Sequence, residues 1–255
     1  EKIARVLKDQ PAYQAQANAM QALTDKDPKQ ALKYLDSAVK FQPGEGQFWE
    51  LRGHAWSMLD NLANADQAFS TAITKNPDYF SHYLARGVLR FKQGQKTAAS
   101  NDLEKSQKLL PTPVASLYLG NIAHANGDSE TAINYYREAA QTEGDIGQQA
   151  NDKLASIEMN QAPNRYILNK LSVDSNGYLL LSVYNRSNIP AAGVVVQVTE
   201  MISAYVTGPS VQITIGTLSA NTQKTISTRI GPIKDEATLN RYRALVIAAK
   251  PIAPS

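Results

Sequence analysis

The sequence contains no cysteine, which excludes disulfides, thiol nucleophiles and cysteine-based zinc sites. It also lacks any apolar run near the roughly eighteen residues that a membrane-spanning helix requires. None of the strings HExxH, GxSxG, GxGxxG or the phosphate-binding P-loop occurs. We therefore expect no direct membrane span, and the absence of cysteine leaves the redox compartment of the protein open.

Histidine is scarce as well, with His54, His82 and His124 as the whole set. No two of them are four residues apart, so no helix face carries the histidine pair of a helical metal site. Carboxylates such as Asp27 and Asp128 precede predicted helices, where capping of backbone N–H groups explains them. We expect no catalytic residue, no metal site and no cofactor. This chain is therefore predicted not to be an enzyme, while the full-length protein could include a metallopeptidase.

Positive charge is unevenly distributed along the chain. Residues 1–162 carry 17 Lys and Arg against 19 Asp and Glu, whereas residues 163–255 carry 9 against 4. The basic residues of the second part are dispersed and form no run of adjacent cations. Nucleic-acid binding needs clustered positive charge on one face, so we do not expect a nucleic-acid partner.

Residues 48–77 contain the clearest copy of an internal repeat. Successive alanines of the pattern are 34, 34 and 33 residues apart. Within each copy a small residue on the first helix is followed by a small and then a large apolar residue on the second helix, and three copies end in proline. The matched positions are Gly53, Gly87 and Gly120; Ala31, Ala65, Ala99 and Ala132; Leu35, Phe69, Leu103 and Tyr136; and Pro43, Pro77 and Pro111.

This pattern resembles the tetratricopeptide repeat, in which pairs of helices stack into a right-handed superhelix. Glycine and alanine leave room for two helices to approach closely, and the large apolar residue fills the space opposite. Proline then ends the pair, because it cannot continue a helix. The spacing predicts helix pairs at about 12–25 with 28–41, within 46–77, within 80–111, and at 114–125 with 129–141, after a short helix that Pro11 closes.

The predicted first domain is residues 1–162, an α-solenoid of four repeats with a capping helix at about 146–159. After MNQAPN the hydrophobic period changes from 3.6 to 2, which marks a domain boundary. We expect proteases to cut first between Met159 and Arg165, because a linker has few contacts. The fold class is thus α + β in two domains.

Residues 163–255 are predicted to form an all-β sandwich. The chain there consists of short β-branched runs, which are separated by turn sequences such as DSNG, RSNIPAAG and GPS. The stretch LLLSVYNRSNIPAAGVVVQVTEMI resembles two strands and the connecting turn of small bacterial immunoglobulin-like modules. That resemblance implies an immunoglobulin-like sandwich of two sheets.

A second resemblance covers residues 1 to about 158. The segments KDQPAYQAQANAMQAL, PDYFSHYLARGVLRFKQGQ and ASNDLEKSQKLLPTPVASLYLGNIAHANGD look like the repeat region that follows the protease domain in bacterial M48-type zinc metallopeptidases, including the periplasmic β-barrel assembly-enhancing protease. This likeness implies a periplasmic docking arm. The zinc motif of that family is absent, so no catalytic residue carries over.

The resemblance to tetratricopeptide repeats also implies a concave groove, which the first helix of each pair lines. A clamp in some members binds a chaperone's C-terminal carboxylate, but Gln16 and Met20 stand where its first Lys and Asn would be. A mixed groove suits an extended or helical peptide instead, although these positions could also be ordinary solvated helix faces. The predicted groove residues are Tyr13, Gln16, Met20, Gln47, Glu50, His54, Ser81, Leu84, Val88, Asn121 and His124.

The sequence therefore predicts a protein–protein interaction module that binds a polypeptide segment, as the docking or regulatory part of a larger envelope protein. One alternative is the non-catalytic C-terminal region of a periplasmic M48-type peptidase, and another is a cytoplasmic or lipoprotein scaffold. Because the chain begins at Glu1, we expect a processed protein or a piece of a longer one. The periplasm is the expected location, with the cytoplasm as the alternative. The partner and the oligomeric state are unknown.

Overall fold

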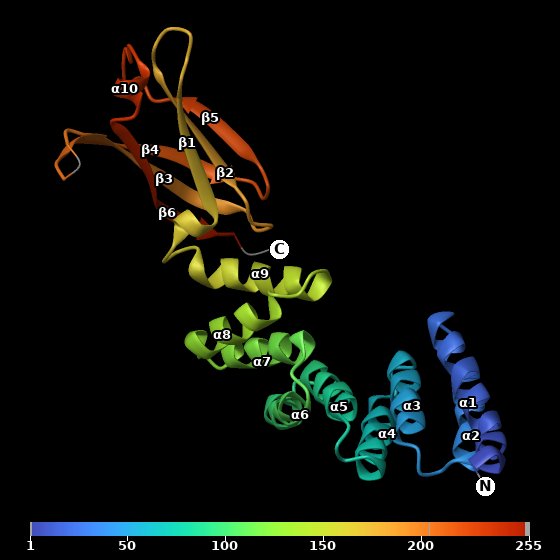
Figure 1. Cartoon of the computed structure of the whole chain (residues 1–255). Helices are drawn as coiled ribbons and strands as arrows, with labels where there is room; N and C mark the ends of the chain where they lie inside the picture. The colour runs from blue at the N-terminus through green and yellow to red at the C-terminus, as the bar shows by residue number, and fades with distance from the viewer. Residues whose placement is uncertain (1, 204, 253–255) are drawn as a thin grey trace. The chain divides into compact units, whose positions relative to one another are not determined.

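The computed structural model describes residues 2–203 and 205–252, and the chain divides into two compact units, Glu1–Ala139 and Ala140–Ser255. In its described part the first unit is helical throughout, with short connections between the helices (Figure 1). Its helices are α1 (Lys2–Thr24), α2 (Pro28–Phe41), α3 (Gly46–Met58), α4 (Leu62–Lys75), α5 (Phe80–Lys92), α6 (Lys96–Leu109), α7 (Pro113–Ala125) and α8 (Ser129–Ala139).

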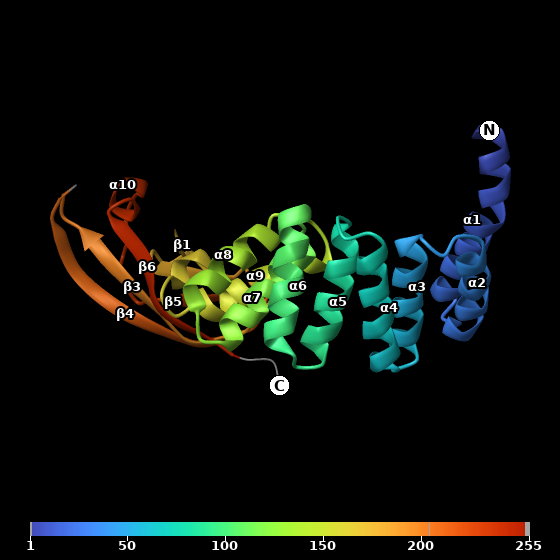
Figure 2. The same cartoon turned by 90° about the horizontal axis from the view of Figure 1, so that it is seen from below.

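These helices form consecutive antiparallel pairs that lie side by side (Figure 2). Several begin where the sequence offers a capping side chain. Asp27 accepts a hydrogen bond from the backbone N–H of Gln30, and Thr112 accepts one from the N–H of Ala115. One expectation is wrong: α1 continues through Pro11 instead of ending there. Ala12 and Ala19, after the proline, are fully buried in the cluster that α1 forms with α2, so packing outweighs the helix-breaking tendency of Pro11.

The repeat register is confirmed by the contacts between the helices of each pair. A Cβ atom on Gly87 would lie 2.8 Å from Cγ of Leu103, and one on Gly120 would lie 2.7 Å from Cδ1 of Tyr136. Gly53 faces Phe69 in the same way. The small and large residues of the pattern are thus direct partners, and only glycine permits the helices to approach this closely.

An ion-pair network joins the second repeat to the third. Arg86 of α5 makes two hydrogen bonds to Asp102 of α6, at 2.6 and 2.9 Å. Arg90 makes two to Asp66 of α4, at 2.7 and 3.1 Å, and a third to Asp102 at 3.0 Å. The hydrogen bonds to Asp66 raise the pKa of Arg90 against the opposing effect of burial. Both arginines are therefore committed to carboxylates of the neighbouring helices.

The second unit combines a helix with a β-structure. In its described part six strands form two three-stranded antiparallel sheets, in the orders β1-β2-β5 and β4-β3-β6. The strands coincide closely with the predicted β-branched runs. The elements are α9 (Asp145–Glu158), a 3-10 turn (Pro163–Arg165), β1 (Ile167–Val173), β2 (Leu179–Asn185), β3 (Ala191–Met201), β4 (Thr207–Leu218), β5 (Gln223–Ser227), α10 (Glu236–Leu239) and β6 (Tyr242–Pro251).

Both sheets contribute to one hydrophobic core, in which Leu181 of β2 and Val196 of β3 are fully buried. Ala155 and Met159, from the end of α9, belong to the same core. The division between units at 139/140 therefore differs from the predicted boundary at 162/163. The helix that was expected to cap the repeats packs its apolar end against the β-strands.

The segment between Met159 and Arg165 also differs from the expected exposed linker. Met159 is fully buried, and Pro163 is buried as well. Arg165 and Tyr166 hydrogen-bond to Glu158 at 3.1 and 2.8 Å. This segment is consequently packed within the second unit, and it is not the exposed linker that early cleavage by proteases requires.

Candidate functional site

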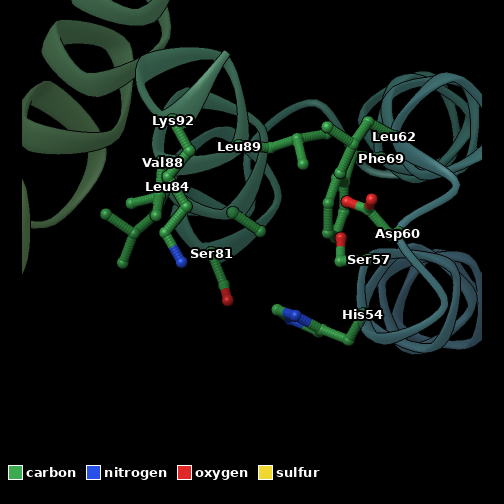
Figure 3. Close-up of a pocket in the computed structure, with 11 residues that line it drawn as sticks. His54, Ser57, Asp60, Leu62, Phe69, Ser81, Leu84, Val88, Leu89 and Lys92 are labelled. Carbon is green, nitrogen blue, oxygen red and sulfur yellow. The ribbon is translucent and has the colours of Figure 1, made fainter. Parts of the chain in front are cut away.

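An open cavity of about 580 Å³ lies between α3, α4 and α5, where the second and third repeats meet. Its apolar wall is formed by Leu62 and Phe69 of α4 together with Leu84, Val88 and Leu89 of α5 (Figure 3). Its polar rim consists of His54, Ser57, Asp60, Ser81 and Lys92. A cavity with one apolar side and a few polar groups at the rim suits a single apolar side chain of a ligand.

His54 and Ser81 lie at the same opening of this cavity, on α3 and α5 respectively (Figure 3). The His54 ring meets Phe69 edge to face, with 5.2 Å between the ring centroids. About half of the His54 side chain is exposed to solvent. The cavity is therefore open on the side where the two predicted groove residues stand.

Behind this opening, Glu50 connects α3 to α5. Its Oε1 accepts a hydrogen bond from Ser81 Oγ at 2.8 Å, and its Oε2 lies 2.5 Å from Nδ1 of His82. His54 Nε2 is 3.7 Å from Oε1, one helical turn along α3. His82 is fully buried, so the carboxylate that holds it also joins two repeats.

The charge on Glu50 is stable in this environment. Burial alone raises the pKa of Glu50, but the interactions with His54, His82 and Ser81 outweigh it and lower the pKa to about 2. Glu50 is therefore ionised throughout the neutral and mildly acidic range. It places a fixed negative charge beside the cavity.

The remaining predicted groove residues lie on three helices. Tyr13 and Met20 on α1 are each about half exposed, and Gln16 donates a hydrogen bond to Gln47 of α3 at 3.3 Å. On α7, His124 is exposed. Asn121, also on α7, accepts a hydrogen bond from the hydroxyl of Tyr136 at 2.9 Å. Burial raises the pKa of Tyr136 to about 12, so the hydroxyl of this tyrosine remains a hydrogen-bond donor. Asn121 therefore links the two helices of the fourth repeat through this hydrogen bond.

Leu84 and Val88 have two roles, and the sequence predicted one of them. Both line the cavity. Both also pack against the buried cluster of the third and fourth repeats, which includes Leu103 and Leu119. The expectation that they face only the groove is therefore wrong, because a first helix contacts its own partner and the next first helix at once.

The cavity includes residues that the sequence reasoning did not assign to a site. Leu62 and Phe69 come from the second helix of a repeat, and Ser57, Asp60 and Lys92 lie near helix ends. The prediction used only central positions of the first helices. Phe69 is the clearest example, because the repeat pattern marks it as the large residue opposite Gly53. That pattern predicts a core position for Phe69 and gives no indication that it also lines a cavity.

Within the described residues, no group of three His, Asp or Glu side chains could hold a metal ion. No helix in that part of the chain is both long and apolar enough to cross a bilayer.

Residues 84–149 match the family model of the tetratricopeptide repeat. A curated relative is the human protein SGT1 homolog, which is 27% identical over 88 residues. That alignment covers 34% of this chain and 24% of the human protein. The chain thus matches only about a quarter of this relative.

Two solved structures resemble the chain with a TM-score of 0.51. One is MamA, residues 41 to the end, from Desulfovibrio magneticus RS-1, with 18% identity over 58% of this chain and 84% of that one. The other is the Cut9–Hcn1 hetero-tetramer of the APC/C, with 22% identity over 56% of this chain and 29% of that one. At this identity the likeness concerns the fold. Residues 84–149 are thus similar to tetratricopeptide repeats, and the helical unit shares the helical-repeat fold of these structures.

Proposed function

We propose that the helical unit binds a segment of another polypeptide, with one apolar side chain of that segment seated in the cavity between α3, α4 and α5. The observation that carries this proposal is the cavity itself, with its wall of Leu62, Phe69 and Leu89 open beside polar His54 and Ser81. Tetratricopeptide repeats mediate protein–protein interaction, which agrees with this assignment. The proposal assigns binding, and no catalysis, to this chain.

Few charged residues line the cavity: they include the cation Lys92 on one side and the carboxylate Asp60 on the other (Figure 3). Affinity would therefore come mainly from burial of the apolar anchor, and hydrogen bonds at the rim would select the ligand's orientation. Binding is expected to change little between low and moderate salt, because few exposed ion pairs would be screened.

The test is selection of binders from a displayed library of random linear peptides on the immobilised full chain, followed by fluorescence polarisation with synthetic peptides. Ala85 lines the cavity, so Ala85→Leu fills part of it and is expected to weaken binding at least fivefold. Ala63→Leu adds the same side chain at an exposed position of α4 and serves as the control.

Ser57→Leu fills the cavity from α3 and provides a second test in case Ala85→Leu does not fold. Circular dichroism establishes that each variant retains its helices. The proposal fails if folded Ala85→Leu and Ser57→Leu proteins bind the selected peptides as tightly as the control. It also fails if no peptide is selected.

We further propose that the chain acts as the docking or regulatory part of a larger envelope protein in the periplasm. The M48-type peptidase alternative rests on the resemblance of residues 1 to about 158 and on no other observation. A scaffold in the cytoplasm or on a lipoprotein is the second alternative. Reading the coding sequence upstream of Glu1 for HExxH and a signal peptide separates the envelope, peptidase and scaffold roles.

Membership of the β-unit in the immunoglobulin-like class is likewise a proposal, supported by the two antiparallel sheets that share one core.

A further inference from the structure

We propose that the segment bound in this cavity carries a basic residue, Lys or Arg, next to its apolar anchor, and that Glu50 recognises that cation. This inference rests on the proposed function, since it concerns the same cavity. It names the chemistry of the partner, which is an apolar–basic sequence and not an acidic tail.

The first observation is the unused hydrogen-bonding capacity of Glu50. A carboxylate offers about four acceptor positions. Ser81 Oγ and His82 Nδ1 occupy two of them, one on each oxygen. His54 Nε2 lies 3.7 Å from Oε1, which is within ion-pair distance but longer than a hydrogen bond. Glu50 does not itself line the cavity, but its side chain is 15% exposed and is bonded to Ser81 at the rim, so a ligand donor beside Ser81 can reach the remaining positions.

The second observation is the orientation of the hydrogen bonds at the rim. Ser81 donates its one hydroxyl proton to Glu50, so toward a ligand it presents lone pairs and acts as an acceptor. His54 stands at the same opening and is about half exposed, so a ring nitrogen can accept a hydrogen bond from a ligand group. This end of the cavity is consequently built to accept hydrogen bonds, as an ammonium or guanidinium group requires.

The third observation is that the two arginines of α5 bind carboxylates outside the cavity. Arg86 and Arg90 are held by Asp102 and Asp66, and neither lines the cavity. The cation among the lining residues is Lys92, at the last position of α5, whereas Ser81 is near its beginning. Neither arginine of α5 therefore competes for Glu50, and its carboxylate complements a basic residue of a partner.

The experiment extends the library selection into a double-mutant cycle. The full chain is expected to select peptides in which Leu, Met or Phe lies within two positions of Lys or Arg. One such peptide and its Lys→Gln form are then measured by fluorescence polarisation against the wild-type protein and Glu50→Gln. In this variant one amide oxygen remains as an acceptor for either Ser81 or His82, the NH2 group takes the place of the other oxygen, and the negative charge is removed.

The loss of the peptide's lysine is expected to weaken binding to the wild-type protein about fivefold, the size of a partly exposed ion pair, and to Glu50→Gln less than twofold. Equal losses in both proteins, or selected peptides that lack basic residues or carry acidic ones, overturn the inference. In those cases the cavity still binds apolar anchors, as judged by Ala85→Leu. If peptide binding is instead insensitive to Ala85→Leu and Ser57→Leu, the proposed function itself fails.

Discussion

At the scale of single residues, the repeats depend on small side chains at close helix crossings. Ala65 on α4 is fully buried and shares a cluster with Phe69 and Leu89, whereas Ala63 on the same helix is exposed. A residue's place on the helix face therefore decides what a larger side chain does there.

Ala65→Leu is expected to lower the free energy of unfolding by about 1–3 kcal/mol, because the added carbons have no space between the packed helices. Ala63→Leu is expected to change it by less than about 0.5 kcal/mol. Chemical denaturation followed by helical circular dichroism measures both. Similar losses at the two positions would mean that the repeat register is incorrect.

Glu50 makes stability depend on pH. Its pKa falls from 4.5 to about 2 on folding, so the folded state favours the ionised form. This stabilisation is complete above pH 4.5 and is lost as the pH falls toward 2, because the unfolded chain then binds a proton more readily than the folded one. The difference between 4.5 and about 2 corresponds to roughly 3 kcal/mol, at about 1.4 kcal/mol per pKa unit.

Glu50→Gln is expected to have a flatter stability curve between pH 4.5 and 2 than the wild-type protein. Thermal denaturation in a series of buffers provides the measurement, and Glu45→Gln, outside this cluster, is the matched control. A variant curve parallel to that of the wild type across this range would refute the role of Glu50.

At the scale of elements, α5 is held to its neighbours by charged as well as apolar contacts. Asp102 of α6 is 4% exposed and receives hydrogen bonds from both Arg86 and Arg90. Removal of one partner from such a buried group leaves the opposite charges without compensation.

Asp102→Asn is expected to destabilise the helical unit by about 3 kcal/mol or more, because two guanidinium groups lose their shared carboxylate. Glu104→Gln, at an exposed position of the same helix, is expected to cost less than about 0.5 kcal/mol. Urea denaturation of the two variants gives the comparison. A small effect for Asp102→Asn would indicate that this carboxylate contributes little to holding α5 against its neighbours.

At the scale of the whole molecule, the chain consists of two units whose connection lies at residues 140–144. Glu143 in this connection is exposed, whereas Glu158 is 7% exposed and bound by Arg165 and Tyr166. Proteolysis requires backbone that can leave its contacts, so the two sites differ in susceptibility.

A glutamate-specific protease is expected to cut after Glu143 first and to yield two fragments, residues 1–143 and 144–255, that resist further cleavage. Mass spectrometry of a time course identifies the order of cuts. The Glu143→Gln variant, which lacks the site, should remain intact over the same period. First cleavage after Glu158 would restore the boundary near residue 162.

The order of elements in this protein follows from the sequence alone. The 34-residue spacing of small and large residues specifies which positions meet, because every repeat pairs its two helices in the same way. Gly87 and Leu103 are in contact, as the pattern requires. The positions of the strands could also be predicted, since a hydrophobic period of two and β-branched residues are local properties of the sequence.

Tertiary packing decided the remainder. The end of α9 carries an apolar face that the sequence could not assign to the repeats or to the strands, and Ala155 and Met159 join the β-core. The cavity combines α3 and α5 with Phe69 of α4, and the hydrogen bond from Ser81 to Glu50 spans 31 residues. Local patterns specify helices and strands, whereas contacts between residues far apart in the chain depend on how those elements pack.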